Sequence, residues 1–429
     1  MRTHLDRLRS TVGLLFGSQS GGGDELGRAS YDLWRARVAT SESDMGAVEA
    51  KLHEAAVVAA RWHDFGDPTY REGLGRLLTA IELSDYTAAQ RERIRRTLIV
   101  PALRSRLYSE RGWQERPHCL NDPIDAPLMV CGLPRTGTTA LHQLLSMDER
   151  AQGLNGWLVL CPMPRPPRDK WMTFSEYRAV ATVQKAAMRA EGSVKAAHLR
   201  TADRVDEPLE LMSQSFVTNT FPALFHLPVY DEWFRAQDQR PTYRRLADNL
   251  RLIGSNDRDK SWLLQNPGNI LSLDALLDVF PDARIVWTHR EPGRTLASLS
   301  SLLAGVRTTL LGETVSTNDI APREVSLWSH AVARAMDIHD RHPNNFHDVD
   351  FDTFVADPLG TARGIYEKFG LTLDKRSESV MRAWVRDNPI GKHGVHSYNR
   401  EEFGLSDDLI KQRFGGYIER FGLARKTAA

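Results

Sequence analysis

Hydrophobic residues follow a helical spacing through the first quarter of the chain. Between Leu26 and about Arg111, apolar residues recur three or four positions apart, as in AVEAKLHEAAVVAARW and GLGRLLTAIEL. That spacing places them on one face of a helix. The preceding stretch SQSGGGDE has the composition of a flexible linker. We expect residues 1–115 to form a helical N-terminal region with a flexible start.

From Ala126 onward, short apolar runs are each followed by a glycine-containing turn and a helical segment. PLMVCGL predicts a strand and TALHQLLSM a helix, and later ARIVWTH predicts a strand, REPGR a loop and TLASLSSLLAGV a helix. Strands that alternate with helices form a mostly parallel sheet with helices on both faces. The predicted fold class is therefore α/β, with residues 116–429 as its domain. Ligands of such sheets bind at the carboxyl ends of the strands.

The composition narrows the class of protein. Lys and Arg total 56 against 55 Asp and Glu, a formal net charge of +1, so no basic field suggests a nucleic-acid partner. The three cysteines lie far apart, which fits a reducing compartment and argues against a disulfide scaffold or a zinc site. No apolar run approaches the roughly 18–20 residues of a membrane span. We expect a cytoplasmic protein without stable membrane insertion; a membrane-touching N-terminal helix is the alternative.

The segment MVCGLPRTGTTALHQLL places a glycine-rich turn between the first predicted strand and its helix. The spacing is that of a phosphate loop, G-x-x-x-x-G-K-[ST], but a threonine stands in the lysine place and an arginine lies inside the loop. Backbone N–H groups, the helix dipole, hydroxyls and a guanidinium together attract a phosphate-type anion. The alternative is a strand-to-helix turn without a ligand. The candidate anion-binding residues are Arg135, Thr136, Gly137, Thr138 and Thr139.

Two separated segments, in this order, resemble the sulfotransferases that use 3′-phosphoadenylyl sulfate (PAPS), in their bacterial branch. GLPRTGTTALHQLL is similar to their 5′-phosphosulfate loop, and FPDARIVWTHREPGRTLASLSSLL to their 3′-phosphate segment. GDPTYREGLGRLL, VYDEWF and HSYNREEFGLSDDLIKQRFGGYIERFG extend the resemblance from about residue 65 to the end. The resemblance implies a P-loop NTPase-like sulfotransferase fold and PAPS as co-substrate without a metal. It also implies a hydroxyl acceptor that is a small molecule or lipid-like.

The resemblance also assigns roles to residues outside the loop. Arg290, which follows the strand ARIVWTH, and Ser298 are expected to hold the 3′-phosphate. A basic loop near the C-terminus closes over the nucleotide in such proteins, so Lys392 and His396 are candidates for that contact. The alternative for these two residues is a solvated polar loop.

The transfer requires a base that removes the proton of the attacking hydroxyl. RVDEPLELMSQSF places Glu207 before an apolar helix, where the bacterial branch tends to have an acidic pair. Glu207 is the first choice, and Asp206 and His198 are the second choices. The alternative is structural: Asp206 would cap the helix, while Glu207 and Glu210 would favour its first turn.

Gln265, in WLLQNPGNIL, departs from the family pattern. Relatives commonly carry a lysine here, which contacts the transferring sulfate, whereas glutamine donates a hydrogen bond without a charge. Arg135 and the loop amides remain to meet the charge that develops during transfer. A catalytically weak or silent PAP- or PAPS-binding protein is therefore an alternative. A nucleoside or small-molecule kinase is a weaker one, because Thr138 replaces its lysine and no Walker B aspartate is found.

Two further segments have competing explanations. The aromatic residues of FVTNTFPALFHLPVYDEWF would either wall an apolar acceptor pocket or pack a core. DVDFDTF hints at a calcium loop but lacks the glycine and glutamate that such a loop needs, so the polar face of an edge strand is the simpler explanation.

Overall fold

Five short strands form one parallel sheet in the computed structural model, which describes residues 45–195, 201–312, 315–388 and 400–423. The strand order is β2-β3-β1-β4-β5. The strands are β1 (Leu128–Gly132), β2 (Ala151–Gln152), β3 (Ser261–Gln265), β4 (Arg284–His289) and β5 (Phe346–Asp350). The predicted α/β class with a mostly parallel sheet is confirmed, and β1, which leads into the glycine-rich loop, is the central strand.

The sheet is covered on both faces because successive side chains of a strand point to opposite sides. All five residues of β1 are buried. Met129 and Cys131 join a core with the helices of one face, and Leu128 and Val130 join a core with those of the other. On the first face lie α12 (Arg240–Gly254), α13 (Leu273–Val279), α14 (Pro292–Leu311), α15 (Ile320–Arg341) and α19 (Asp407–Arg420). On the second lie α6 (Thr138–Leu145), α16 (Phe351–Ala356), α17 (Pro358–Lys368) and α18 (Lys375–Asp387).

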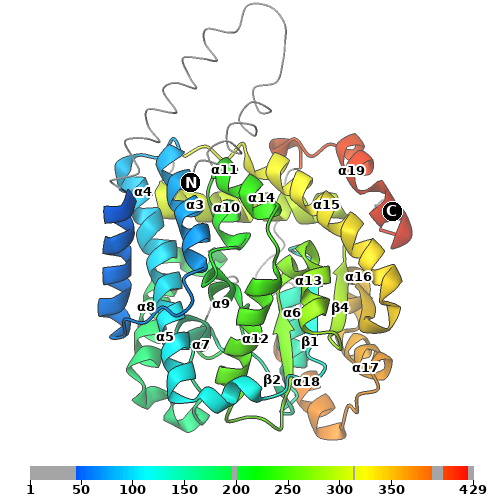
Figure 1. Cartoon of the computed structure of the whole chain (residues 1–429). Helices are drawn as coiled ribbons and strands as arrows, with labels where there is room; N and C mark the ends of the chain where they lie inside the picture. Colours follow the sequence, from blue (N-terminus) through cyan, green and yellow to red (C-terminus); the bar gives the residue numbers. More distant parts are fainter. Residues whose placement is uncertain (1–44, 196–200, 313–314, 389–399, 424–429) are drawn as a thin grey trace, which may run out of the picture.

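A layer of N-terminal helices packs beside the sheet region, on the left in Figure 1. It contains a helix over 45–60, α3 (Tyr70–Leu83), α4 (Ala88–Ile94) and α5 (Val100–Glu115), with a π-helical turn between the last two. Between β2 and β3 run α7 (Gly156–Leu160), α8 (Ser175–Lys195), α9 (Leu209–Ser213), α10 (Thr220–Leu224) and α11 (Pro228–Arg235). The expected helical N-terminal region is present, and the domain boundary after residue 115 stays a prediction.

The N-terminal helices share a core with residues from the middle of the chain. Leu74, Leu77 and Leu103 are fully buried in it. The aromatic residues that come to it from the middle of the chain are Phe216, Phe221, Phe225, Tyr230 and Phe234. These five side chains therefore pack in a core, the second of the two explanations considered for this segment.

The edge strand β5 ends with the first residues of the DVDFDTF segment noted in the sequence. Asp348 and Asp350 lie on this edge strand, as expected, whereas Asp352 lies in α16. Asp350 accepts a hydrogen bond from the backbone N–H of Thr353 and so caps α16. Over the described residues, no cluster of three potential metal ligands is found.

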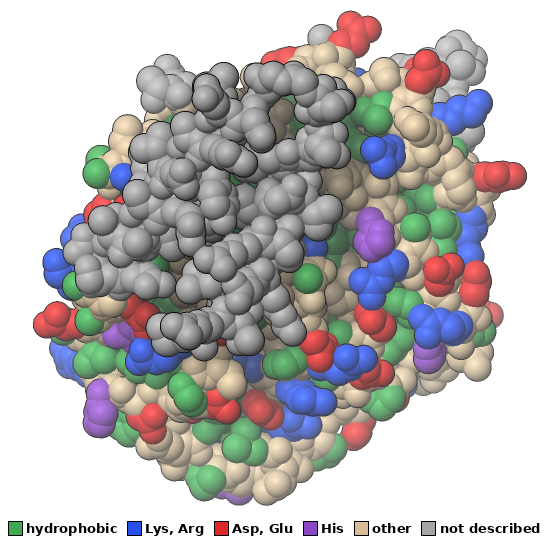
Figure 2. Space-filling model, turned by 45° about the horizontal axis from the view of Figure 1, so that its top comes forward, with side chains coloured by type: hydrophobic (Ala, Val, Ile, Leu, Met, Phe, Trp, Pro, Cys, Tyr) green, Lys and Arg blue, Asp and Glu red, His purple; other side chains and the backbone are tan. Residues whose placement is uncertain are grey.

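The surface carries both signs of charge. On the face that Figure 2 shows, basic and acidic side chains are interspersed, in keeping with the near-neutral net charge. Within the part of the chain that the structure describes, no helix has the length and apolar character required to cross a bilayer.

Candidate functional site

The glycine-rich loop joins the carboxyl end of β1 to the N-terminus of α6. Gly132 has φ 149°, and a Cβ on it would lie 2.4 Å from the carbonyl oxygen of Thr288 on β4. Gly137, the N-cap of α6, has φ 85°. Arg135 has φ 72°, a left-handed conformation that is uncommon for a residue with a side chain. The loop thus turns sharply, and its backbone N–H groups precede a helix N-terminus, an arrangement that binds anions.

Hydroxyl groups fix the loop to the neighbouring strand. The Thr136 hydroxyl donates to the carbonyl oxygen of Leu133 at 2.7 Å and lies 2.6 Å from the Thr288 hydroxyl, which donates to Cys131. The Thr136 side chain is buried. Its hydroxyl therefore serves the loop itself and leaves the backbone N–H as the group that can meet a ligand. Thr139, in contrast, is exposed at the start of α6.

The two predicted anion grips meet in space. Arg135 donates from Nε to the hydroxyl of Ser298 at 3.0 Å, and Arg290 donates from a terminal nitrogen to the carbonyl oxygen of Arg135 at 3.0 Å. Arg290 follows β4 directly and Ser298 lies on α14. Glu291 caps α14 by accepting hydrogen bonds from the N–H groups of Gly293 and Arg294, which fixes the direction of the helix.

Arg290 lies in a crowded and partly desolvated position. Its guanidinium carbon is 3.9 Å from the centre of the Phe351 ring, within cation–π range. Burial lowers the pKa of Arg290, and the nearby cations Arg294 and Arg135 lower it further, while Asp352 acts in the opposite direction. Like charges brought together in this way favour the binding of an anion between them.

Three of the predicted residues meet at the other end of the loop. Gln265, the last residue of β3, is almost fully buried beside β1. Its side-chain nitrogen donates to the Thr138 hydroxyl at 3.1 Å and to Glu207 Oε1 at 3.0 Å. A single carboxamide thus links the loop to the candidate base, and a carboxamide NH₂ has the two protons that this requires.

The acidic pair has a different local role from the helix cap considered in the sequence. Asp206 accepts a hydrogen bond from the N–H of Glu207 at 2.8 Å, and its own N–H donates to the carbonyl oxygen of Leu154. Pro208 occupies the N-cap position of α9. The idea that Asp206 caps that helix is therefore wrong: its carboxylate instead holds the turn that presents Glu207.

Lys392 and His396, expected to cover the nucleotide, lie outside the described residues, as does His198, a second choice for the base.

Sequence reasoning missed a polar network behind Arg290. His289, the last residue of β4, is buried and lies 2.9 Å from both the Tyr417 hydroxyl and an oxygen of Asp348, and His339 contacts the second oxygen of Asp348. Burial lowers the pKa of His289. Burial alone would raise the pKa of Asp348, but the two histidines lower it below its ordinary value. The sequence carried no signal for this network, because it depends on β5 lying beside β4, where Trp287 pairs with Asp348 and His289 with Asp350.

Comparisons with known proteins find relatives of this chain. A model of the sulfotransferase family matches residues 127–375. The crystal structure of sulfotransferase STF1 from Mycobacterium tuberculosis H37Rv is similar, with a TM-score of 0.77 and 35% identity, covering 86% of this chain and 98% of that one. Sulfotransferase STF9 from Mycobacterium avium has a TM-score of 0.80 and 25% identity, covering 88% and 98%.

A relative with a specific name matches at lower identity. The omega-hydroxy-beta-dihydromenaquinone-9 sulfotransferase Stf3 of Mycobacterium bovis is 23% identical over 308 residues, which cover 71% of this chain and 76% of that protein. The resemblance read from the two sequence segments is thereby confirmed.

Proposed function

The chain belongs to the sulfotransferase family, and from that premise we propose that it transfers the sulfuryl group of PAPS to a hydroxyl of a lipid-like acceptor. The family makes it an enzyme of sulfuryl transfer, so the kinase alternative is set aside. One observation supports the finer proposal. The glycine-rich loop that follows β1 lies between the two candidate phosphate-binding groups, which Arg135 contacts, and the candidate base, which Gln265 contacts.

The recognition end of the loop suits a phosphate dianion. Arg290 and Ser298 would hold the 3′-phosphate, since planar guanidinium groups grip phosphate oxygens in pairs. Arg135 contacts Ser298 through its side chain and Arg290 through its carbonyl oxygen, and so connects these two residues to the phosphosulfate loop. The charges at this end of the loop also suit a phosphate. Burial and neighbouring cations lower the pKa of Arg290, and a bound dianion would offset both effects.

The reaction end would perform an in-line displacement at sulfur. Glu207 accepts the proton of the acceptor hydroxyl while the new oxygen–sulfur bond forms. The bond between sulfur and the bridging phosphate oxygen breaks, its electron pair stays on that oxygen, and PAP departs. The Thr138 hydroxyl and the loop N–H groups stabilise the negative charge on the departing phosphate and the transferring sulfate. Arg135 supplies the positive charge that Gln265 lacks.

Gln265 would position both sides of this reaction. Its carboxamide holds the Thr138 hydroxyl and the Glu207 carboxylate within hydrogen-bond distance of one nitrogen. A lysine there would pair with Glu207 and lower the proton affinity of the carboxylate. A neutral donor fixes the carboxylate with a smaller effect on its basicity, which suits a base. This role explains how activity is compatible with the departure from the family pattern.

The acceptor class is proposed from one relative and from chemistry. The named activity of Stf3 concerns a hydroxylated menaquinone derivative, which is a lipid. We propose a lipid-like alcohol for this chain as well. A cytoplasmic location is proposed with it, because all three cysteines are buried and unpaired, as in a reducing compartment.

The test begins with calorimetric titration of the full chain with PAP, with its analogue that lacks the 3′-phosphate, and with ATP plus Mg²⁺. We expect PAP to bind best, and binding should fall sharply when the 3′-phosphate is removed. Equal binding of PAP and the analogue would contradict the assignment of Arg290.

Transfer of labelled sulfuryl groups from PAPS to long-chain alcohols is the second step. Product that forms only with a hydroxylated acceptor supports the enzyme. PAP binding without transfer to any acceptor would favour a silent PAP-binding protein, the alternative that the neutral Gln265 motivates.

A further inference from the structure

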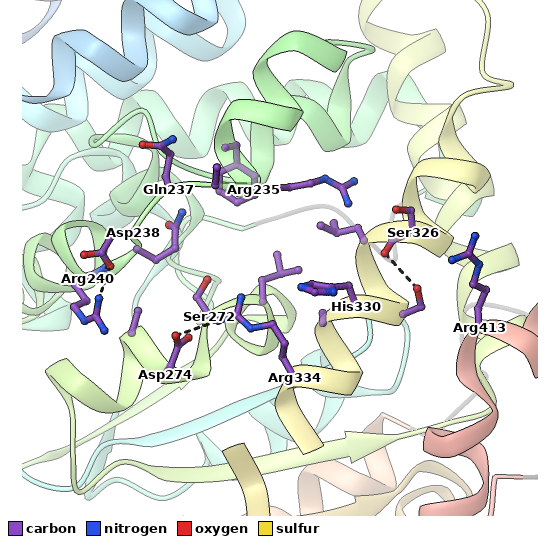
Figure 3. Close-up of a pocket in the computed structure, with 18 of the residues that line it drawn as sticks. Arg235, Gln237, Asp238, Arg240, Ser272, Asp274, Ser326, His330, Arg334 and Arg413 are labelled. Atoms are coloured by element: carbon purple, nitrogen blue, oxygen red, sulfur yellow. Dashed lines mark hydrogen bonds and ion pairs between the residues drawn. The ribbon is translucent and has the colours of Figure 1, made fainter. Parts of the chain in front are cut away.

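A cavity of about 890 Å³ lies between helices from the middle and from the C-terminal part of the chain. Its walls come from the end of α11 and the start of α12, from the start of α13, from the middle of α15 and from α19. Figure 3 shows this space with side chains from these elements around it. None of the residues assigned to PAPS or to the base lines it. It is therefore a second site candidate with its own chemistry.

The cavity has a local excess of positive charge. Four arginines and His330 line it, against two aspartates, whereas the whole chain is almost neutral. The arginines come from four different helices: Arg235, Arg240, Arg334 and Arg413. Guanidinium groups stay charged at any physiological pH. A cavity with this lining favours an anionic occupant.

Three of the arginines have acidic partners at the surface. Arg235 contacts Asp231 at 2.9 Å, and Arg334 contacts Asp274 at 3.1 Å. Arg240 contacts both Asp238 and Asp278. Most of these side chains are partly exposed, and such ion pairs are weak because water screens them. A multiply charged ligand can therefore compete for the same guanidinium groups.

The other arginine and the histidine of the lining lack such partners. His330 on α15 and Arg413 on α19 are exposed, and among the described residues neither has an ion pair or a side-chain hydrogen bond. Figure 3 shows Arg235 above His330 and Arg413 to the right, each on a different helix. A ligand that reached from one to the other would need more than one anionic group.

We propose that this cavity binds a ligand with at least two phosphate-type anionic groups. Arginine forks hold phosphate oxygens in pairs, and the cavity is larger than a single phosphate requires. The ligand is either a soluble phosphate compound or the headgroups of anionic lipids, because both present the same chemistry to the arginines. The proposal is independent of the PAPS assignment, since the two sites share no residue.

The test compares two matched changes of charge. The first is the double variant His330→Gln and Arg413→Gln, which removes the two groups without ion-pair partners. The control is Arg382→Gln, an exposed arginine on α18, which packs on the other face of the sheet. Each protein is titrated calorimetrically with inorganic pyrophosphate in the presence of saturating PAP, which keeps pyrophosphate out of the phosphosulfate loop.

We expect the wild type and the control to bind pyrophosphate alike, and the double variant to bind it about tenfold more weakly or worse. Binding should also weaken as salt is added. Sedimentation with phosphatidylglycerol vesicles, against phosphatidylcholine vesicles, tests the lipid source with the same variants. Loss of binding by the double variant in either arm supports the proposal and identifies the source.

No binding in both arms, or equal loss in the double variant and in the control, would overturn it. The single variants His330→Gln and Arg413→Gln keep the test decisive if the double variant fails to fold. Failure of PAP to bind would count against the transfer site alone, because the comparison of the two variants does not depend on it.

Discussion

The two ends of the glycine-rich loop are built from different kinds of side chain. At the recognition end, Arg135 and Arg290 lie together with Ser298, and Arg290 lies against an aromatic ring. At the reaction end, a neutral amide links a hydroxyl to the carboxylate of Glu207. The recognition end thus brings positively charged side chains together, whereas at the reaction end a neutral hydrogen-bond donor is paired with two acceptors.

The difference shows how one loop can use different residues for binding the nucleotide and for catalysing the transfer. An anion that binds between neighbouring cations relieves their mutual repulsion, so the recognition end should determine how tightly the nucleotide binds. A carboxylate held by a neutral donor loses less basicity than one paired with a cation, so the reaction end should determine turnover. If the separation is real, substitutions at one end change binding and those at the other change the rate.

Glu207→Gln is expected to have the largest effect. The amide cannot accept the proton of the acceptor, so turnover should fall about 10²–10⁴-fold. PAP affinity should change little, as measured by calorimetry. The matched control is Glu210→Gln, in the first turn of α9, which should keep most of the activity. Equal losses in the two variants would place the base elsewhere.

Arg290→Ala should affect binding instead. Loss of a two-point grip on phosphate is expected to cost about 3 kcal/mol, or roughly 100-fold in PAP affinity. The analogue without the 3′-phosphate should bind both proteins alike. Arg290→Lys retains the charge without the planar fork and should be intermediate. An unchanged preference for the 3′-phosphate in the alanine variant would contradict the assignment of nucleotide binding to the recognition end.

Gln265→Ala should lower turnover about tenfold through misplacement of Glu207, since one side-chain link to a charged group is lost. PAP affinity should stay within a few-fold of the wild type. Gln265→Glu is the sharper variant, because a second carboxylate at this distance should raise the pKa of the pair and shift the acid side of the rate profile to higher pH. An unshifted profile would show that Gln265 does not contact the base during turnover.

Ser298→Ala should have a small effect on affinity. Its hydroxyl accepts one hydrogen bond from Arg135, and the loss of such a bond costs about 1 kcal/mol, or roughly fivefold in PAP binding. Turnover at saturating PAPS should not change. A lower turnover with unchanged affinity would mean that Ser298 acts at the reaction end.

Asp348→Asn should lower the stability of the protein, because it removes the carboxylate that contacts His289 and His339. The histidines hold the pKa of Asp348 below its ordinary value, so the unfolded chain takes up the proton more readily than the folded protein. The stabilisation by the carboxylate is therefore present at neutral pH and is lost as the pH falls below about 4. The variant should melt a few degrees below the wild type at pH 7, and the gap should narrow with acidification. A gap independent of pH would exclude the titration of Asp348 as its cause.

The sequence predicted most of the fold because strand and helix patterns were clear around the loop. PLMVCGL and ARIVWTH both formed strands of a parallel sheet, and the carboxyl ends of β1 and β4 brought Arg135 and Arg290 together. The order of the strands could not be derived, because it depends on contacts between segments that are distant in the sequence. For the same reason, the sequence did not predict that Gln265 would contact Glu207.

The interpretation of the aromatic segment also required the fold. Its side chains suit an acceptor pocket or a core equally well by composition, and only their packing against α3 and α5 decided between them. The stacking of Phe351 on Arg290 was missed because nothing in the spacing of the two residues relates them; β5 has to lie beside β4 first.

The shared core of the N-terminal helices has a consequence for how the chain emerges from the ribosome. Leu74, Leu77 and Leu103 leave the exit tunnel more than a hundred residues before Phe216 and Tyr230, the side chains that cover them. During that interval the leucines lack the part of their native cover that these later side chains supply, and exposed apolar surface of this kind favours aggregation. Synthesis speed between residues 107 and 230 should therefore affect the yield of folded protein more than speed in the later sheet strands.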